Sequence, residues 1–230
     1  MVAKKRQKSK LREYIEVIVI SVLLALFVRT FVVQAFRIPS GSMEDTLLVG
    51  DFLLVSKFLY WFTDPQPGDI IVFKYPLDPS RDFIKRCVAV EGQTVEIRQK
   101  ELFVDGRRIT LPPQGKHVDS ATYPQGTNAR DNFGPVNVPP GHVFVLGDNR
   151  DNSRDSRYWG FLNEKLIKGK AFILYWSWQR EGQDPQLAKL DGPMLLALPG
   201  FVLSFMKVLV FDLVHLPQRV RWARIGDLIH

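Results

Sequence analysis

The 230-residue sequence has few of the residues that cross-link a chain or bind metals. It contains one cysteine, Cys87, and four histidines, His117, His142, His215 and His230. One cysteine cannot form an intrachain disulfide, and the scattered histidines show no zinc-ligand spacing. The sequence therefore predicts no disulfide framework and no metal site.

Acidic residues are absent from the first twelve positions, where six of the basic residues lie. The formal net charge of +7 reflects 31 Lys and Arg against 24 Asp and Glu, so the rest of the chain carries about +1. The basic charge belongs to a tail rather than to a nucleic-acid-binding face, and we expect no nucleic-acid partner. Internal repeats are also absent, and the 46% of apolar residues is typical of a folded protein.

A long apolar run from Tyr14 to Val33 follows this tail. At about 1.5 Å per residue the run is about 30 Å long, which matches the hydrocarbon core of a bilayer. The basic tail, residues 1–13, is expected to stay in the cytoplasm, with everything after the run outside. A cleaved secretory signal is the alternative, because Val33-Gln34-Ala35 loosely fits the small-x-small rule. Arg29 interrupts the run before that site, which favours a lasting transmembrane anchor.

Beyond residue 38 the pattern predicts a mainly antiparallel β protein. Short or alternating apolar runs bounded by turn residues are typical of strands, and Asp105-Gly106 is a favoured hairpin turn. The expected strands are 51–58, 69–75, 82–90, 94–98, 101–109, 142–148 and 170–178. Residues 110–140 are rich in Pro, Gly, Asn and Gln and lack apolar periodicity, which indicates a long excursion or a small subdomain.

A second apolar segment, residues 193–217, contains Lys207, Asp212 and His215. These residues make it a poor spanning helix. A helix at the membrane surface is favoured, and a buried soluble helix remains open. The basic residues that follow, Arg219, Arg221 and Arg224, favour the spanning alternative instead, because basic flanks are usually cytoplasmic.

Three short segments contain candidate catalytic residues. The first holds Ser40 and Ser42 around a glycine, but a serine hydroxyl needs a base and donors for the oxyanion, and such tetrapeptides form turns more often than active sites. The second places Lys85 on the same face of a strand as Phe83 and Cys87. A lysine whose ammonium reaches water is the ordinary alternative. To act as a base, Lys85 needs a pKa well below its usual value of about 10.4.

The third segment is the polar stretch Gly147 to Phe161, GDNRDNSRDSRYWGF. A loop that binds its own backbone through Asx turns is one interpretation. A calcium loop is another, although the oxygen-bearing residues lack EF-hand spacing and the closing glutamate.

Taken together, the three segments resemble a known family. PSGSMEDTLLVGDFLLVSKF, FIKRCVAVEGQTVEI and VPPGHVFVLGDNRDNSRDSRYWGF are similar, in the same order, to the three sequence blocks of bacterial type I signal peptidases. They cover much of residues 36–161. The basic tail and single anchor also resemble the N-terminal arrangement of that family.

The resemblance implies roles for individual residues. Ser42 would be the acylated nucleophile and Lys85 the general base, and the Ser40 hydroxyl would help to bind the oxyanion beside the Ser42 backbone N–H. Ser153 matches the serine that hydrogen-bonds and orients the lysine.

Three further residues match supporting positions. Asp155 and Arg157 match a structural ion pair, and Met43 would lie in the substrate groove. The implied fold is an antiparallel β catalytic core, residues 36–90 and 141–230, with a smaller β subdomain, residues 91–140, inserted into it.

The implied function is removal of signal peptides from exported preproteins, after a small-x-small motif, without metal or cofactor. The implied location is the inner (plasma) membrane, with a single anchor and the catalytic domain on the extracytoplasmic side. Two alternatives stay open: a self-cleaving Ser-Lys repressor, for which no DNA-binding domain is visible, and a non-catalytic membrane-tethered module that binds peptides.

Overall fold

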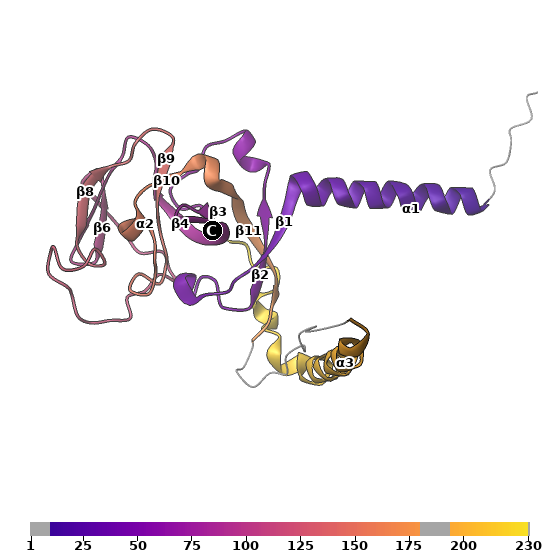
Figure 1. The fold of residues 1–230 in the computed structure, drawn as a ribbon. Helices are drawn as coiled ribbons and strands as arrows, with labels where there is room; N and C mark the ends of the chain where they lie inside the picture. The colour runs from indigo at the N-terminus through magenta and orange to yellow at the C-terminus, as the bar shows by residue number, and fades with distance from the viewer. Residues whose placement is uncertain (1–9, 180–193, 230) are drawn as a thin grey trace, which may run out of the picture.

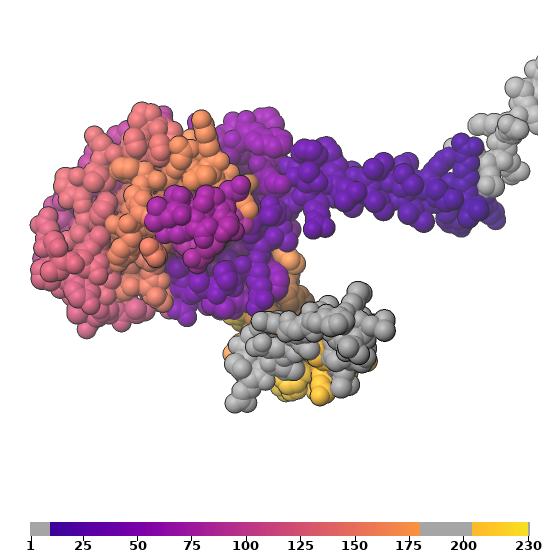
Figure 2. Space-filling model, in the orientation of Figure 1, coloured from indigo at the N-terminus to yellow at the C-terminus, as the bar shows by residue number. Residues whose placement is uncertain are grey.

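The computed structural model describes residues 10–179 and 194–229 (Figure 1). Helix α1, Lys10–Phe27, continues through a π-helical turn, η1, Val28–Val32, into the first strand. Its side chains are not buried by the described parts of the chain, and it projects away from the β body (Figure 2). Among the described residues, the run Lys10–Val32 is the one helix long and apolar enough to cross a membrane. The predicted N-terminal helix is therefore confirmed.

The larger sheet has seven strands in the order β1-β2-β11-β3-β4-β9-β10, and every pairing in it is antiparallel. Its strands are β1 Val33–Arg37, β2 Asp51–Ser56, β3 Ile70–Tyr75, β4 Asp78–Ala89, β9 His142–Leu146, β10 Leu162–Asn163 and β11 Ile167–Ser177. The predicted mainly antiparallel β fold is confirmed. β1 and β10 were not among the expected strands.

Strand β3 shows how the larger sheet is packed. Ile70 and Val72 lie in one buried cluster, whereas Ile71 and Phe73 lie in another. Because successive strand residues point to opposite faces, β3 is buried on both faces, and it lacks the apolar-polar alternation of a half-exposed strand.

A second sheet of four strands has the order β7-β6-β5-β8. Its strands are β5 Thr94–Arg98, β6 Glu101–Val104, β7 Arg107–Ile109 and β8 Phe133–Asn137. Asp105-Gly106 joins β6 to β7, as its sequence predicts. β8 was not predicted, because its residues lack apolar periodicity; it forms through pairing with β5, as in Val95 opposite Val136.

Short helices complete the architecture. They are η2 Gly41–Met43, η3 Leu59–Trp61, α2 Ser156–Trp159, η4 Glu164–Leu166 and η5 Trp222–Arg224, and the longer α3 spans Met194–Arg219. After α3 the chain returns to β11, where Val220 bridges Trp178 and Leu228 bridges Ile173. The chain therefore leaves and re-enters the larger sheet at neighbouring points.

Candidate active site

The 3-10 turn η2 places Ser42 opposite a lysine on strand β4. Lys85 Nζ lies 2.7 Å from Ser42 Oγ and donates to it, and also donates to the Ile84 carbonyl oxygen at 2.8 Å. Lys85 is only 3% exposed, and its Nζ lies 5.4 Å from the centre of the Phe83 ring. The structure thus brings together the two residues that the sequence singled out as nucleophile and base.

Burial lowers the pKa of Lys85 to about 8. Asp155 and Asp148 raise it again at a distance, and Arg157 lowers it further. Within the described residues, no carboxylate is within ion-pair distance of Nζ, so the apolar surroundings dominate. At neutral pH an appreciable fraction of this lysine is therefore a neutral amine.

A groove of about 720 Å³ opens in front of this pair. Ser40 is exposed and lines the groove together with Ser42 and Lys85. The remaining lining residues are Pro39, Gly41, Tyr75, Arg81, Asp82, Phe83, Ile84, Asn152 and Arg154. Both Ser42 and Lys85 can therefore be reached from this groove.

Met43 differs from its expected position. Its side chain is fully buried in a cluster with Ile38, Leu47 and Leu53, and it does not line the groove. Its sulfur accepts a hydrogen bond from the Asp148 backbone N–H at 3.4 Å. The tight turn of η2 directs Ser42 outward and Met43 inward, so the expected groove position of Met43 is wrong.

Ser153 packs closely against the nucleophile turn through Gly147. A Cβ atom added to Gly147 would lie 2.2 Å from Ser153 Oγ and 2.5 Å from the Ser42 carbonyl oxygen. Ser153 is 8% exposed, and its Oγ has no hydrogen-bond partner among the described residues. The hydrogen bond to Lys85 that the family resemblance implies is therefore not formed here, where Nζ donates to Ser42 Oγ and the Ile84 carbonyl oxygen.

Asp155 and Arg157 form a buried ion pair at 2.8 Å, with side chains 0% and 2% exposed. The Asp155 carboxylate also accepts from the Gly147 backbone N–H at 3.1 Å. Arg157 donates to the carbonyl oxygens of Arg130 and Arg150. The pair therefore connects the loop beside Ser42, at Gly147, to the backbone at Arg130.

A second buried ion pair was missed by sequence reasoning. Arg86, the neighbour of Lys85 on β4, contacts Asp148 at 2.8 Å, and Thr46 donates to the same carboxylate at 2.6 Å. Asn149 donates through its backbone N–H to the Ser42 carbonyl oxygen and through its side chain to the Gly41 carbonyl oxygen. The available signal was an arginine within a buried strand, which requires an acidic partner.

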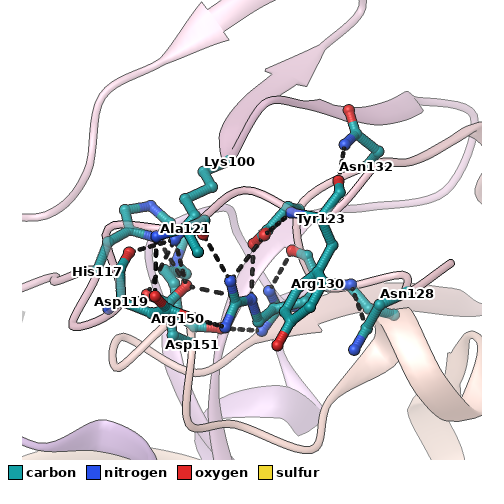
Figure 3. A network of polar contacts seen from close by, with 12 residues as sticks. Lys100, His117, Asp119, Ala121, Tyr123, Asn128, Arg130, Asn132, Arg150 and Asp151 are labelled. Carbon is teal, nitrogen blue, oxygen red and sulfur yellow. Dashed lines mark hydrogen bonds and ion pairs between the residues drawn. The ribbon is translucent and has the colours of Figure 1, made fainter. Parts of the chain in front are cut away.

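A polar network joins the loop after β9 to the four-stranded sheet region (Figure 3). Asp151 accepts from His117 at 3.0 Å, from Lys100 at 3.3 Å and from the Asp119 backbone N–H at 2.8 Å. Burial alone would raise the pKa of Asp151, but these hydrogen bonds outweigh it and lower the pKa to about 2.

Arg130 continues the network, with ion pairs to Asp131 and Asp119 at 2.8 Å each. Within the described residues, no three His, Cys, Asp or Glu side chains are placed to hold a metal ion.

A serine hydroxyl in contact with a buried lysine of lowered pKa is the arrangement of a serine hydrolase that uses lysine where others use histidine. Comparison with known proteins agrees with this class. A family model described as "Signal peptidase, peptidase S26" matches residues 11–176, and the chain belongs to this family. It is accordingly a serine endopeptidase of the signal peptidase type with an N-terminal membrane anchor.

Two sequence relatives support the assignment. Signal peptidase I of Aquifex aeolicus is 33% identical, over 85% of this chain and 94% of the relative. Probable signal peptidase I-1 of Synechocystis is 41% identical, over 75% and 86%. A solved signal peptidase I from Enterococcus faecalis V583 is 31% identical, over 47% of this chain and 97% of that one, with a TM-score of 0.37. The family match ends within β11, so α3 lies outside it.

Proposed function

We propose that this chain removes N-terminal signal peptides from exported preproteins, with Ser42 as nucleophile and Lys85 as general base. The observation that carries the proposal is the 2.7 Å contact between Lys85 Nζ and Ser42 Oγ inside a site where burial lowers the lysine pKa. A base within hydrogen-bond reach of the nucleophile, with a pKa near the working pH, meets both requirements of general base catalysis.

The reaction proceeds through an ester. Neutral Lys85 accepts the hydroxyl proton as Ser42 Oγ attacks the carbonyl carbon of the scissile bond, and the resulting oxyanion is held by the Ser42 backbone N–H and the Ser40 hydroxyl. Protonated Lys85 then gives its proton to the leaving amine, which breaks the C–N bond. A water molecule, deprotonated by Lys85, hydrolyses the ester and restores Ser42.

The substrate binds in the groove as an extended strand, with small residues at the first and third positions before the cut. The exposed Ser40 and the partly buried Phe83 line this groove together with the dyad. Ser153, Asp155 and Arg157 act indirectly, because their contacts hold the loop that packs against the Ser42 turn.

The location follows from the anchor. Residues 1–13 are cytoplasmic, residues 14–33 cross the inner (plasma) membrane, and the β body lies on the extracytoplasmic side. The catalytic core comprises residues 36–90 and 141–230, with the subdomain 91–140 inserted. Enzyme and signal peptide are then held at the same membrane surface.

The test is cleavage of a preprotein with an Ala-x-Ala site by the detergent-solubilised full chain. Ser42→Ala and Lys85→Ala should each abolish cleavage, and the double variant should be no worse, because the two residues act as a unit. The matched controls are Ser80→Ala and Lys74→Ala, which change an exposed serine and lysine outside the groove. Cleavage at the parent rate by either dyad variant would contradict the assignment.

Mass spectrometry of the chain after exposure to an acylating β-lactam or lipopeptide inhibitor separates this proposal from a non-catalytic binding module. We expect one covalent adduct on the peptide containing Ser42, and none in Ser42→Ala. A self-cleaving repressor type would instead convert its own chain to fragments without added preprotein.

A further inference from the structure

Helix α3 is an excursion from the end of β11, an interior strand of the larger sheet. Trp178 directly follows β11, and Val220 directly follows α3, and these two residues form a backbone bridge. The Arg221 backbone N–H donates to the Ser177 carbonyl oxygen at 3.1 Å. The two ends of the excursion are therefore fastened together.

The chain after α3 belongs to the catalytic body. The Gly226 N–H donates to the Leu174 carbonyl oxygen at 2.8 Å, and the Leu174 N–H donates to the Asp227 carbonyl oxygen at 2.9 Å. Ile229 lies in the same buried cluster as Met43. A single crossing of the membrane by α3 would put this segment and β11 on opposite sides, which these contacts forbid.

The described part of α3 has an apolar face that the rest of the described chain leaves uncovered. Its exposed residues are Phe205, Met206, Leu209, Val210, Leu213 and Val214. At about 100° per residue, they fall within about half the circumference of the helix. A set of this size on one face of a helix indicates a partner.

The polar side chains of α3 point the other way. His215 and Arg219 are half-buried on the opposite side of the helix, and the half-buried Asp212 lies at the border of the two faces, next to Phe205. Lys207 lies at the border of the two faces, where a lysine can bury its stem and keep its ammonium in water. Lys207 and Asp212 can therefore stay out of the hydrocarbon when the apolar face of α3 contacts it.

The arrangement of the two helices identifies the partner. Both α1 and α3 project from the same side of the β body, and α1 is seen lengthwise while α3 is seen nearly end-on (Figure 1). Because α1 crosses the bilayer along its own axis, α3 runs along the plane of that bilayer. Trp222, just beyond α3, is 54% exposed, and tryptophan is enriched at the membrane surface.

We propose that the apolar face of α3 lies in the outer surface of the bilayer that α1 crosses, as a second membrane contact of the catalytic domain. The proposal rests on the membrane orientation given under the proposed function, but not on the roles of Ser42 and Lys85. Lipid is favoured over a second copy of the chain because α3 projects on the same side of the β body as the anchor (Figure 1), and because an interfacial helix separates its apolar and charged faces in this way.

Fluorescence in reconstituted vesicles tests the proposal directly. Leu213→Cys, on the apolar face, and Gln218→Cys, on the polar side, are each labelled with an environment-sensitive fluorophore in the full chain. Cys87 is fully buried and its thiol pKa is raised to about 12 by burial, so it should not react. The vesicles contain phosphatidylethanolamine and phosphatidylglycerol with a nitroxide placed shallow or deep along the acyl chain.

We expect the shallow nitroxide to quench the Leu213→Cys label several-fold more than the Gln218→Cys label, and aqueous iodide to show the reverse order. Strongest quenching by the deep nitroxide would indicate a crossing and overturn the proposal. Quenching by iodide alone at both positions would overturn it too. Protection from both quenchers that depends on the protein-to-lipid ratio would identify a second copy as the partner instead.

Activity measurements test the membrane contact of α3 independently. Leu209→Ser combined with Leu213→Ser should slow processing of a membrane-inserted preprotein several-fold and leave cleavage of a short soluble peptide unchanged. The matched control is Lys207→Gln combined with Gln218→Ser, which should change neither rate. Equal processing of the inserted preprotein by the two double variants would contradict a role in catalysis at the membrane. If the parent chain cleaves nothing, the proposed function fails while the fluorescence result still decides the membrane contact.

Discussion

Two regions of this molecule bury basic side chains in opposite ways. At the active site, Lys85 is 3% exposed and is bonded to a hydroxyl and a carbonyl oxygen, without a contacting acid. In the network shown in Figure 3, Lys100 and Arg130 are nearly as buried, and both contact carboxylates. A buried cation is stabilised by an acid in contact. Burying Lys85 without such an acid therefore destabilises the folded chain, whereas Lys100 and Arg130 are stabilised by their carboxylate partners.

The difference supports the proposed role of Lys85 as a base. Lys100 contacts the Asp151 carboxylate at 3.3 Å, whereas burial without such a pair disfavours the charged form of Lys85. The acids nearest to Lys85 are already engaged, Asp155 by Arg157 and Asp148 by Arg86. These acids still raise the pKa of Lys85, but by less than burial lowers it, and Arg157 offsets part of their effect.

The largest expected effect comes from removing the unpaired lysine. Lys85→Met keeps the volume and apolar contacts of the side chain, so we expect a folded protein whose turnover falls by roughly 10⁶-fold, as for other dyads and triads that act as units. Preprotein cleavage measures the loss. Lys100→Met is the matched variant in the other region. A comparable loss of turnover in this variant would contradict a special catalytic role of Lys85.

Ser40→Ala tests the active site without touching the lysine. It removes one donor to the oxyanion while the Ser42 backbone N–H remains, and loss of such a donor typically costs about 10²- to 10³-fold in turnover. Steady-state kinetics with a short peptide measure the effect. Turnover equal to the parent would remove Ser40 from the oxyanion site.

The third prediction concerns stability against pH. The pKa of Lys85 is about 8 in the folded chain against an ordinary 10.5. Between these values the unfolded chain holds the proton on Lys85 and the folded chain does not, so the contribution of Lys85 to stability rises with pH across this window. The rise amounts to about 3 kcal/mol. Lys85→Met should abolish it and be more stable than the parent below pH 8, as denaturant titrations at several pH values would show.

The other region should respond at the acid end. The folded pKa of Asp151 is lowered to about 2, so its stabilising contribution is complete above pH 4 and is lost as the pH falls toward 2. Asp151→Asn should remove this dependence and leave the alkaline window unchanged. A common window for both variants would show that the two regions are not electrostatically separate.

Arg130→Gln should have a smaller effect. It leaves Asp131, which is fully buried, without its ion-pair partner, at a cost of about 2 kcal/mol in the free energy of unfolding. Turnover per folded molecule should stay close to that of the parent. A large loss of turnover without loss of stability would instead show that the network positions the catalytic loop through the Arg130 carbonyl oxygen.

The mildest effect is the slope of the pH-rate profile. Only neutral Lys85 acts as a base, so the rate should rise about tenfold per pH unit below pH 8 and level off above it. The measurement is single-turnover cleavage, in which chemistry limits the rate. A flat profile between about pH 6 and 8 would count against a lysine base.

Local patterns predicted much of the fold. Residues 94–98 formed a strand with those limits, and Asp105-Gly106 formed the expected turn, because apolar spacing and turn chemistry are properties of neighbouring residues. β8 was missed because Phe133–Asn137 owes its strand to β5, about 40 residues earlier in the chain.

The candidate site, like the fold, could be predicted only in part. Ser42 and Lys85 could be proposed from the sequence because they belong to sequence blocks with a family resemblance. The partner of Arg86 was not, because Asp148 lies 62 positions away and no local spacing links them. Met43 was misplaced because the direction of its side chain depends on a single tight turn. What sequence reasoning lacked was therefore the long-range pairing that decides which polar side chains meet.

The bridge between Trp178 and Val220 separates the length of the intervening chain from the integrity of the enzyme. The carboxylate of Asp51 reinforces this seam by contacting Arg221 and Arg224 at 3.4 and 2.8 Å. Whatever segment lies between these two residues, the C-terminal segment packs at the same place on β11. The segment between Trp178 and Val220 is thus a position where one targeting element can be exchanged for another, by evolution or by design. The proposed catalytic residues would stay unchanged.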